Sequence, residues 1–265
     1  MTTTRLDRMG AEDMASAPRW GLRTLAGAGL VLAVLTACGT APQDALSPAA
    51  VAAPTPAATP TPSAPSVLGP GEEGAEVRAL QQRLNDAGYW IGEVDGSWDE
   101  LTTQAVYAVQ KVAGLDPSGV VDEQTRAAIT QGVAPTPRST GDAIEIDKER
   151  QLLMVVRGGQ IVMIQHTSTG SDIPYAETVK GVTYTGDAHT PVGSFRVFRD
   201  IDALDHAPLG DMYRPKYFNG GIAVHGHESV PTHGASHGCA RLTNEAMDRI
   251  WENNWMPIGS TVLVY

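Results

Sequence analysis

Residues 143–164 read AIEIDKERQLLMVVRGGQIVMI, and this stretch decides the fold of the C-terminal half of the 265-residue chain. Ala143–Asp147 alternates apolar and polar residues, and Leu152–Val156 is a continuous apolar run that is typical of a buried strand. The Gly-Gly pair within Arg157–Gln160 favours a hairpin turn before a further apolar strand. The stretch therefore predicts a β domain.

This two-residue period begins at Gly141, so we expect the β domain to span residues 141–265. Apolar clusters predict further strands at residues 192–198, 221–224 and 261–265. One helix is expected before the last strand, with Thr243 or Asn244 as its N-cap. A mostly β, sandwich-like domain is the predicted architecture.

The preceding segment, residues 67–131, has a helical period instead. Val77, Leu80 and Leu84 recur at helical spacing, and Asp122 is placed to cap a later short helix. Together with the loop glycines, this pattern predicts a small all-α domain of three helices, joined to the β domain by a linker at residues 132–140. Trp90 and Trp98 could stack on sugar rings or be partly buried.

Residues 1–66 are organised differently. Arg19 and Arg23 precede a short apolar run, Leu25–Leu35, which is too short to cross a bilayer as a helix. Residues 1–37 are therefore interpreted as a signal peptide that ends before Cys38. Residues 38–66 consist mainly of Ala, Pro, Thr and Ser and are predicted to be an extended tether.

Composition excludes one large class of function and indicates where the chemistry lies. A formal net charge of −11 is the opposite of the basic footprint that nucleic-acid binding requires. All seven histidines fall in the C-terminal half, at positions 166, 189, 206, 225, 227, 233 and 237. No cofactor motif is recognised, so we expect neither a cofactor nor nucleic acid as a partner.

Cys239 is the candidate nucleophile, because the other of the two cysteines, Cys38, is explained by the N-terminal segment. His225 ends an apolar, strand-like run and is the candidate base. Gly226 leaves room for a backbone carbonyl to fix the imidazole tautomer. We expect the imidazole to lower the pKa of the Cys239 thiol below its free value.

The residues around the cysteine suggest further roles. His237, Gly238 and Cys239 present successive backbone N–H groups, which could form an oxyanion hole. Arg241 either binds an anionic group of the substrate or forms a structural salt bridge, and the sequence leaves both open.

Three alternative functions were weighed. His225, His227, His233, His237 and Cys239 are ligand types suited to zinc, but their spacing matches no motif with a physical rationale, so no metal is expected. A papain-like hydrolase is excluded because its cysteine precedes its histidine. A wall-binding protein with an inactive catalytic domain is disfavoured, since His225 and Cys239 are both present.

Three motifs carry a resemblance to a known enzyme family: His189–Phe195 (HTPVGSF), Phe218–Gly226 (FNGGIAVHG) and Ser236–Leu242 (SHGCARL). They resemble the catalytic signature of the L,D-transpeptidases of the YkuD type. The resemblance implies that Cys239 is the nucleophile and His225, beside Gly226, is the base. It also implies oxyanion donors around His237 and Gly238. The implied substrate contacts are Ser236, Tyr217, Asn219 and Arg241.

The same resemblance implies a reaction. Cys239 would attack a peptidoglycan stem tetrapeptide after its third residue and release D-alanine. An amine of a neighbouring stem would then resolve the acyl-enzyme into a 3→3 cross-link. Water as the acceptor would give an L,D-carboxypeptidase. Carbapenems would be expected to acylate the same thiol.

Two further resemblances place the chain at the cell wall. Residues 67–131 resemble a three-helix peptidoglycan-binding domain, through Gly74-x-x-Val77-x-x-Leu80-Gln81, Asp95-Gly96 and Thr103-x-Ala105-Val106-x-x-Val109-Gln110. Leu35-Thr36-Ala37-Cys38 resembles the lipobox of bacterial lipoproteins. The expected location is therefore the outer face of the cytoplasmic membrane, held there by a lipid on Cys38.

Overall fold

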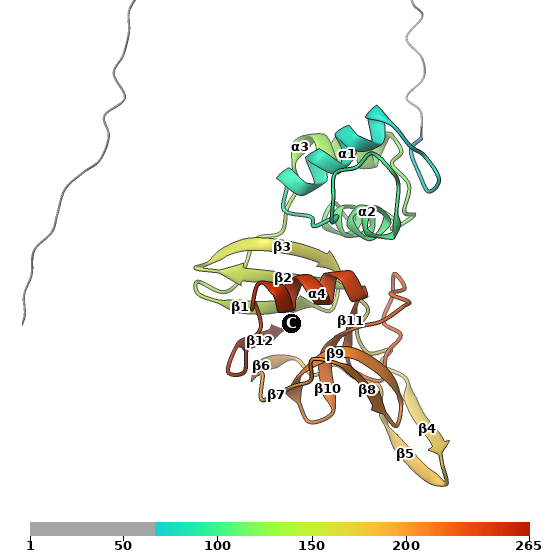
Figure 1. Cartoon of the computed structure of the whole chain (residues 1–265), viewed down its shortest axis with the longest axis vertical. Coiled ribbons are helices and arrows are strands. Elements are labelled where there is room, and N and C mark those ends of the chain that lie inside the picture. Colours follow the sequence, from blue (N-terminus) through green and yellow to red (C-terminus); the bar gives the residue numbers. More distant parts are fainter. Residues whose placement is uncertain (1–66) are drawn as a thin grey trace, which may run out of the picture. The chain divides into compact units, whose positions relative to one another are not determined.

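The computed structural model describes residues 67–265. Its N-terminal part contains three helices (Figure 1). These are α1 (Ala75–Asp86), α2 (Glu100–Val112) and α3 (Glu123–Gln131). Asp99 and Asp122 cap α2 and α3, because their side chains accept the amides of Thr102 and Thr125 at 2.7 and 2.8 Å. The predicted signal peptide, tether and Cys38 lie outside the described residues.

Two buried glutamines organise the loops of this helical segment. Gln81 of α1 accepts the amide of Gly96 at 2.8 Å, and Gln110 of α2 accepts the amide of Gly119 at 3.0 Å. Both glycines have a left-handed backbone, with φ of 83° and 76°. The two equivalent arrangements fit the repeated order of helix and glycine-containing loop in the sequence.

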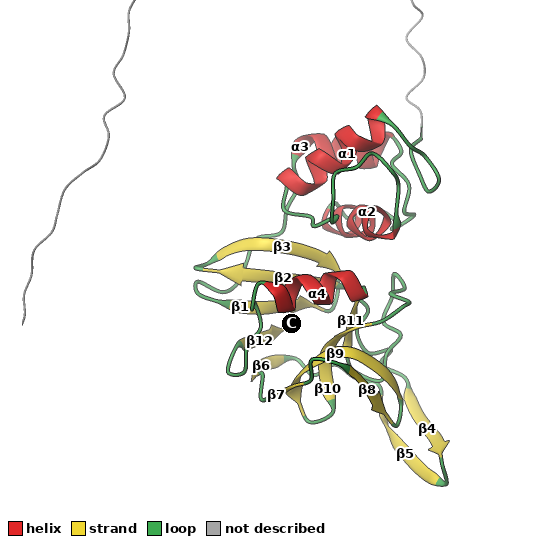
Figure 2. Ribbon diagram, in the orientation of Figure 1, coloured by secondary structure: helices red, strands yellow, loops and turns green. Residues whose placement is uncertain are grey.

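The C-terminal part is built from two sheets, one separate hairpin and one helix (Figure 2). The first sheet has the order β3-β2-β1-β12-β6 and the second the order β11-β10-β9-β7, with β8 beside β9. The strands of the first sheet are β1 (Ala143–Asp147), β2 (Leu152–Arg157), β3 (Gln160–His166), β6 (Gly193–Arg196) and β12 (Thr261–Val264). Those of the second are β7 (Arg199–Asp200), β8 (Leu204–Ala207), β9 (Gly210–Asn219), β10 (Ile222–Gly226) and β11 (Ala240–Leu242).

The remaining elements are the hairpin of β4 (Pro174–Val179) and β5 (Val182–Asp187) and the helix α4 (Asn244–Glu252). Thr243 caps α4 by accepting the amide of Ala246 at 3.1 Å. The predicted fold class, three helices followed by a mostly β domain, is confirmed. Within residues 67–265, none of the helices has the length and apolar character needed to cross a membrane.

Strand β2 is buried on both faces, which explains its continuous apolar sequence. Leu152, Met154 and Val156 pack into a cluster with the three helices, whereas Leu153 and Val155 pack toward α4 and the second sheet. Successive side chains of a strand point to opposite faces, so one strand contributes to two cores. The helical segment therefore covers the outer face of the first sheet.

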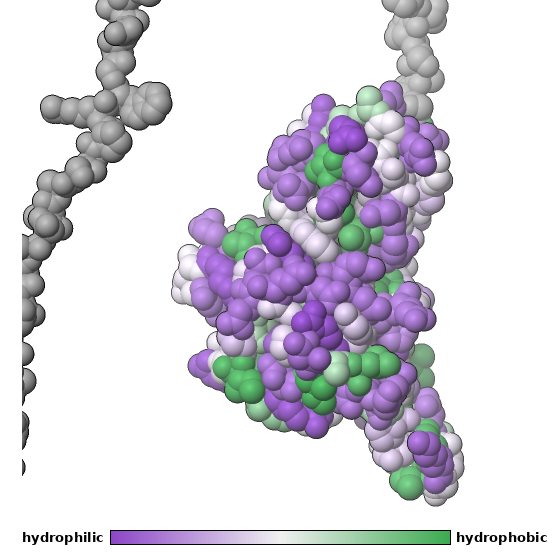
Figure 3. Space-filling view, viewed as in Figure 1, coloured by the Kyte–Doolittle hydropathy of each residue, from purple (hydrophilic) through white to green (hydrophobic). Residues whose placement is uncertain are grey.

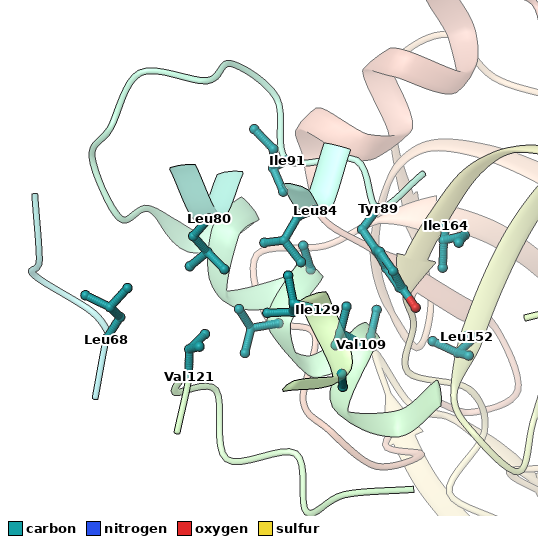
Figure 4. Packing of buried hydrophobic residues seen from close by; sticks show 14 of the residues in the cluster. Leu68, Leu80, Leu84, Tyr89, Ile91, Val109, Val121, Ile129, Leu152 and Ile164 are labelled. Carbon is teal, nitrogen blue, oxygen red and sulfur yellow. The ribbon is translucent and has the colours of Figure 1, made fainter. Parts of the chain in front are cut away.

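The segment after α1 also closes the edge of this sheet. Tyr89 forms an isolated parallel bridge with Ile164 of β3, whose amide donates to the carbonyl of Gly88 at 2.9 Å. The ring of Tyr89 is fully buried between the helices and β3, near Leu152 (Figure 4). This bridge covers part of the exposed edge of β3, where a free strand could otherwise pair with another chain.

Both tryptophans named in the sequence analysis are structural. Trp98 is 8% exposed, and its indole nitrogen donates to Thr103 at 2.8 Å. Trp90 packs against the core between the sheets. The ring of Trp98 is therefore not free to stack on a sugar in this conformation, whereas that of Trp90 is only partly buried.

Candidate active site

Cys239 and His225 line one cavity of about 610 Å³ in the β domain. Strands β10 and β11 are parallel neighbours, and their register pairs His225 with Arg241. Cys239 immediately precedes β11, two residues before Arg241. Alternate residues of a strand share a face, so the thiol, the imidazole and the guanidinium lie on the same side of these two strands.

The orientation of His225 is fixed by the backbone. Its Nδ1 lies 2.9 Å from the carbonyl oxygen of Gly226, which can only accept, so Nδ1 carries the proton and Nε2 is left as an acceptor. Burial lowers the pKa of His225 to about 4, so the ring is neutral at pH 7. A side chain at Gly226 would collide with Asn244 and Tyr213 at 2.6 and 2.8 Å, which explains the glycine.

The Cys239 thiol is in an apolar environment rather than beside an imidazole. Its sulfur accepts from the amide of Ala223 at 3.4 Å and lies 3.8 Å from both the Met212 sulfur and the Gly221 carbonyl. Burial raises the pKa of Cys239 above its ordinary value. The expected lowering of this pKa is therefore wrong, because loss of hydration outweighs the favourable effects of the Ala223 amide and of Arg241.

The turn before the cysteine is held by its own side chains. The Ser236 hydroxyl donates to the carbonyl of Cys239 at 2.6 Å and accepts the amide of Gly238 at 3.0 Å. Thr190 donates to the Gly238 carbonyl at 2.7 Å. The Gly238 amide is thus already engaged and is not a free oxyanion donor, which corrects that expectation. The amide of Cys239 remains the candidate donor.

His237 faces the β4–β5 hairpin. Its Nε2 lies 2.8 Å from a carboxylate oxygen of Glu177, and its ring meets Tyr175 edge-on at 4.6 Å between centroids. His237, Tyr175 and Tyr184 all line the cavity. The hairpin therefore forms one wall of the site.

Arg241 has a guanidinium without a counter-ion. It lines the cavity, its Nε has no hydrogen-bond partner, and it forms no ion pair within residues 67–265. Burial lowers its pKa, while the nearby Cys239 opposes that shift. Of the two roles left open by the sequence, this geometry favours binding of an anionic group over a structural salt bridge.

Of the two β9 residues expected to contact substrate, only Tyr217 lines the cavity. Its hydroxyl donates to Asp205, the guanidinium of Arg199 lies 3.8 Å from its ring centroid, and burial raises its pKa. Asn219 does not line the cavity. It pairs with Ile222 across the Gly220-Gly221 turn, so its place in the motif is explained by closure of that turn.

Sequence reasoning missed the wall opposite His225. This wall comes from β8, β9 and their connection, and none of these was recognised as strand. Its cavity-lining residues include Asp205, His206, Leu209, Asp211 and Met212. Tyr184 and Asp187 of β5 were also missed, because their hairpin is exposed and has no apolar period.

The other histidines have structural or peripheral positions. His227 lines the cavity, with its ring centroid 6.0 Å from that of His225, and accepts the amide of Ser229 at 2.9 Å. The carbonyl of His233 accepts the Ser168 hydroxyl at 2.7 Å. In the described part of the chain, no group of three or more His, Cys, Asp or Glu side chains is placed to hold a metal ion.

Comparison with known proteins is consistent with this arrangement. Residues 73–129 match the family model of a peptidoglycan binding domain, and residues 141–264 match that of the L,D-transpeptidase catalytic domain. The crystal structure of an L,D-transpeptidase (residues 123–326) from Xylanimonas cellulosilytica is 48% identical, covers 77% of this chain and all of that one, and superposes with a TM-score of 0.72. The chain belongs to the L,D-transpeptidase family.

Two further similarities are weaker. An L,D-transpeptidase from Stackebrandtia nassauensis is 20% identical over 78% of this chain and 97% of that chain, with a TM-score of 0.42. The N-acetylmuramoyl-L-alanine amidase CwlL of Bacillus licheniformis is 39% identical over 66 residues, which are 24% of this chain and 18% of the amidase. The chain therefore spans less than a fifth of that relative.

Proposed function

We propose that the protein is a cysteine L,D-transpeptidase that forms 3→3 cross-links in peptidoglycan. The observation that carries the proposal is the shared cavity of Cys239 and His225 on adjacent parallel strands, with Nε2 of His225 free to accept a proton. Family membership supports the same reaction class. The donor is a stem tetrapeptide and the acceptor a second stem.

In the first half-reaction, the Cys239 sulfur attacks the carbonyl carbon of the third stem residue. The thiol proton moves to Nε2 of His225 as the carbon–sulfur bond forms, and the Cys239 amide stabilises the oxyanion. Collapse breaks the carbon–nitrogen bond, and the His225 imidazolium gives its proton to the departing D-alanine amine. The product is a thioester.

In the second half-reaction, an amine of the acceptor stem attacks the thioester. His225 takes the amine proton, the carbon–sulfur bond breaks, and the proton returns to the sulfur. Water in place of the amine gives the L,D-carboxypeptidase reaction from the same thioester. The unpaired guanidinium of Arg241 supports recognition of a carboxylate on one of the stems.

The ionisation of the resting site supports a neutral pair. Burial raises the pKa of Cys239 and lowers that of His225 to about 4, so both groups are uncharged at pH 7. The thiolate then forms only as the proton is transferred during attack. Because no thiol–imidazole hydrogen bond is formed within residues 67–265, this transfer requires a side-chain rearrangement when substrate binds.

The decisive experiment is to incubate residues 67–265 with a disaccharide tetrapeptide and to follow the masses. We expect a cross-linked dimer with loss of one alanine per dimer, and a tripeptide as the hydrolytic product. Cys239→Ala should abolish both products. His225→Ala should lower turnover by several orders of magnitude with the fold retained. Near-normal turnover of His225→Ala would assign the base to His233 or His237 instead.

The inactive wall-binding alternative is separated by the same assay, since it predicts no product from the wild-type protein. The raised pKa of the Cys239 thiol does not distinguish the enzyme from the inactive wall-binding protein, because a neutral cysteine is compatible with either. Carbapenem sensitivity gives a second test. Imipenem should add its mass to the wild-type protein and not to Cys239→Ala.

Both domain assignments point to an exported protein that faces the cell wall. We further propose cleavage before Cys38 and lipidation of its thiol, which would anchor the protein to the outer face of the cytoplasmic membrane. Mass spectrometry of the membrane-extracted protein tests this directly. A mature N-terminus other than a diacylglyceryl-modified Cys38 would refute the anchor and leave the catalytic proposal intact.

A further inference from the structure

The segment that joins the two proposed catalytic residues is in contact with the helical domain. We call residues 227–235 the bridging loop, because it leads from His225 on β10 to the turn that presents Cys239. Four consecutive carbonyls of this loop, those of residues 230–233, accept hydrogen bonds from side chains outside it. Two of those side chains come from α2 of the helical domain.

The contacts are specific in geometry. Gln104 of α2 donates to the carbonyl of Val230 at 3.4 Å, and Lys111 of α2 donates to that of Thr232 at 2.8 Å. Between them, Nε2 of His166 lies 2.9 Å from the carbonyl of Pro231. Neither Lys111 nor His166 lines the cavity shared by Cys239 and His225, so contact with substrate in that cavity does not account for either residue.

Lys111 also fixes the tautomer of His166. The carbonyl oxygens of Pro231 and Gln151, which can only accept, lie 2.9 Å from Nε2 and 3.2 Å from Nδ1 of His166. Because Nδ1 also has the Lys111 amine beside it as a donor, the proton is assigned to Nε2. His166 is 1% exposed, and burial together with the neighbouring Lys111 lowers its pKa to about 3, so the ring is neutral. Its Nδ1 is then an acceptor, and the Lys111 amine lies 3.0 Å from it. Lys111 thus holds Thr232 directly and Pro231 through His166.

Placing the Lys111 amine in this partly buried position costs free energy of hydration, so the position requires an explanation. Lys111 forms no ion pair within residues 67–265, and burial lowers its pKa to about 7. The partners of this partly buried amine, a carbonyl and an imidazole, are neutral, so the amine loses hydration without gaining a counter-ion. The ring of Tyr107, also on α2, meets His166 edge-on at 5.7 Å between centroids and keeps the pair enclosed.

The rest of the loop is held by the β domain alone. Thr169 accepts the amides of Ala235 and Ser236 at 2.9 and 3.0 Å, and Ser168 donates to the carbonyl of His233. The middle of the loop, at Val230 and Thr232, is therefore held by the helical domain, whereas both ends are held by the β domain, since the amide of His227 donates to the carbonyl of Leu242 at 2.8 Å.

We propose that Lys111 and His166 form a carbonyl clamp that positions the bridging loop, and with it His225 relative to Cys239. The helical domain then acts as a positioning part of the catalytic site in addition to any binding of the wall. This inference rests on the proposed function, in which these two residues must meet during turnover. Lys111 and His166 are positioning residues that do not contact substrate.

The test compares variants of residues 67–265 in two assays. Lys111→Met and His166→Leu remove the clamp donors, whereas His166→Gln retains an amide donor close to the position of Nε2. Arg83→Met is the matched control, because it removes one positive charge from an exposed site on α1. One assay is cross-linking of the disaccharide tetrapeptide, and the other is alkylation of Cys239, the single thiol present, by iodoacetamide.

We expect Lys111→Met and His166→Leu to lower kcat by about ten- to a hundredfold with little change in KM. The substitutions displace His225 relative to Cys239 and leave the contacts that bind substrate in place. Alkylation of Cys239 should change in rate in the same two variants. His166→Gln should recover most of the activity, and Arg83→Met should match the wild type. A folded Lys111→Met protein with wild-type kcat and alkylation rate would overturn the clamp.

Two controls keep the outcomes separate. If the wild type makes no product, the proposed function fails, while the alkylation rates still report whether the clamp positions the thiol. If Lys111→Met or His166→Leu does not fold, Gln104→Leu takes their place, since it removes the contact of α2 to Val230 together with the hydrogen bond of Gln104 to Glu100 within α2. Unchanged kcat and alkylation in folded Gln104→Leu would then count against positioning of the bridging loop by α2.

Discussion

The hairpins β2–β3 and β4–β5 are similar in length and differ in what covers them. Strand β2 is buried on both faces, and β3 is paired at its edge by the segment that follows α1. Strands β4 and β5 are exposed along most of their length, and polar and apolar side chains are mixed on the visible surface of the hairpin (Figure 3). The second hairpin pairs with neither sheet.

The two hairpins therefore contribute differently to the surroundings of the cavity that contains Cys239 and His225. The β2–β3 hairpin is an inner layer, and the loop that holds His225 is attached to its end through His166. Tyr175 and Glu177 of the β4–β5 hairpin contact His237, and Tyr175, Tyr184 and Asp187 line the cavity. The covered hairpin should carry stability and the exposed one adjustment to substrate. Three predictions test that contrast.

The largest expected effect is on the free energy of unfolding. Ile164→Ala should destabilise the protein by about 2–5 kcal/mol, because it opens a cavity where β3 meets Gly88 and Tyr89. Val182→Ala, at a residue that is 53% exposed in β5, should change stability by no more than about 0.5 kcal/mol. Urea denaturation of both variants provides the measurement. Equal losses would remove the distinction between the hairpins.

A smaller effect for each pH unit is expected from acid. His166 on β3 binds a proton in the unfolded chain from about pH 6.5, but in the folded protein only from about pH 3. The unfolded state therefore binds more protons in this window, and stability should fall by about 1.4 kcal/mol per pH unit below pH 6.5 from this residue alone. His225, with a pKa of about 4, adds a similar slope.

His166→Gln should flatten part of this dependence, and pH-dependent urea denaturation measures it. The β4–β5 hairpin contains no histidine, so substitutions there should leave the slope unchanged. An identical slope in wild type and His166→Gln would show that the buried imidazole is already protonated when folded.

The smallest effect is expected at the contact between Glu177 and His237. Both side chains are partly exposed, at 48% and 28%, so Glu177→Gln should cost less than about 1 kcal/mol of stability. The melting temperature should accordingly change little, while KM for the donor stem should change if the hairpin adjusts to substrate. A strongly destabilised Glu177→Gln protein would mean that the hairpin is a structural wall after all.

The sequence predicted those elements whose local signals agree with their surroundings. The capping aspartates and the stripe of Val77, Leu80 and Leu84 specify helices, and the apolar run of β2 specifies a buried strand. It did not reveal that the second face of β2 is covered by the helical segment. Burial on two faces leaves the same apolar run whatever the covering element is.

Strand β9 was missed for a local reason. It contains Pro215 and has Arg214 at a φ of 50°, so neither its composition nor its period is typical of a strand. The consequence is that Tyr217 was assigned to the site only through the family motif, and Met212 was not assigned at all.

The sequence predicted which residues form the candidate site better than it predicted their pKa shifts. The order of His225 and Cys239 and their family motifs placed both residues in one cavity. The direction of the Cys239 pKa shift was wrong, because a sequence shows which charges are near along the chain but not how much water remains around a thiol. The engaged Gly238 amide and the turn position of Asn219 likewise depend on three-dimensional pairing.

Because β2 is buried on both faces, its sequence limits where the helical and β domains of different proteins can be exchanged. Leu152, Met154 and Val156 require the side chains of their own helical partner, so a chimaera joined at residues 132–140 would bring two unrelated surfaces together. A fusion joined ahead of Val67 keeps both surfaces native. Module shuffling in this family should therefore succeed at the outer boundary and fail at the inner one.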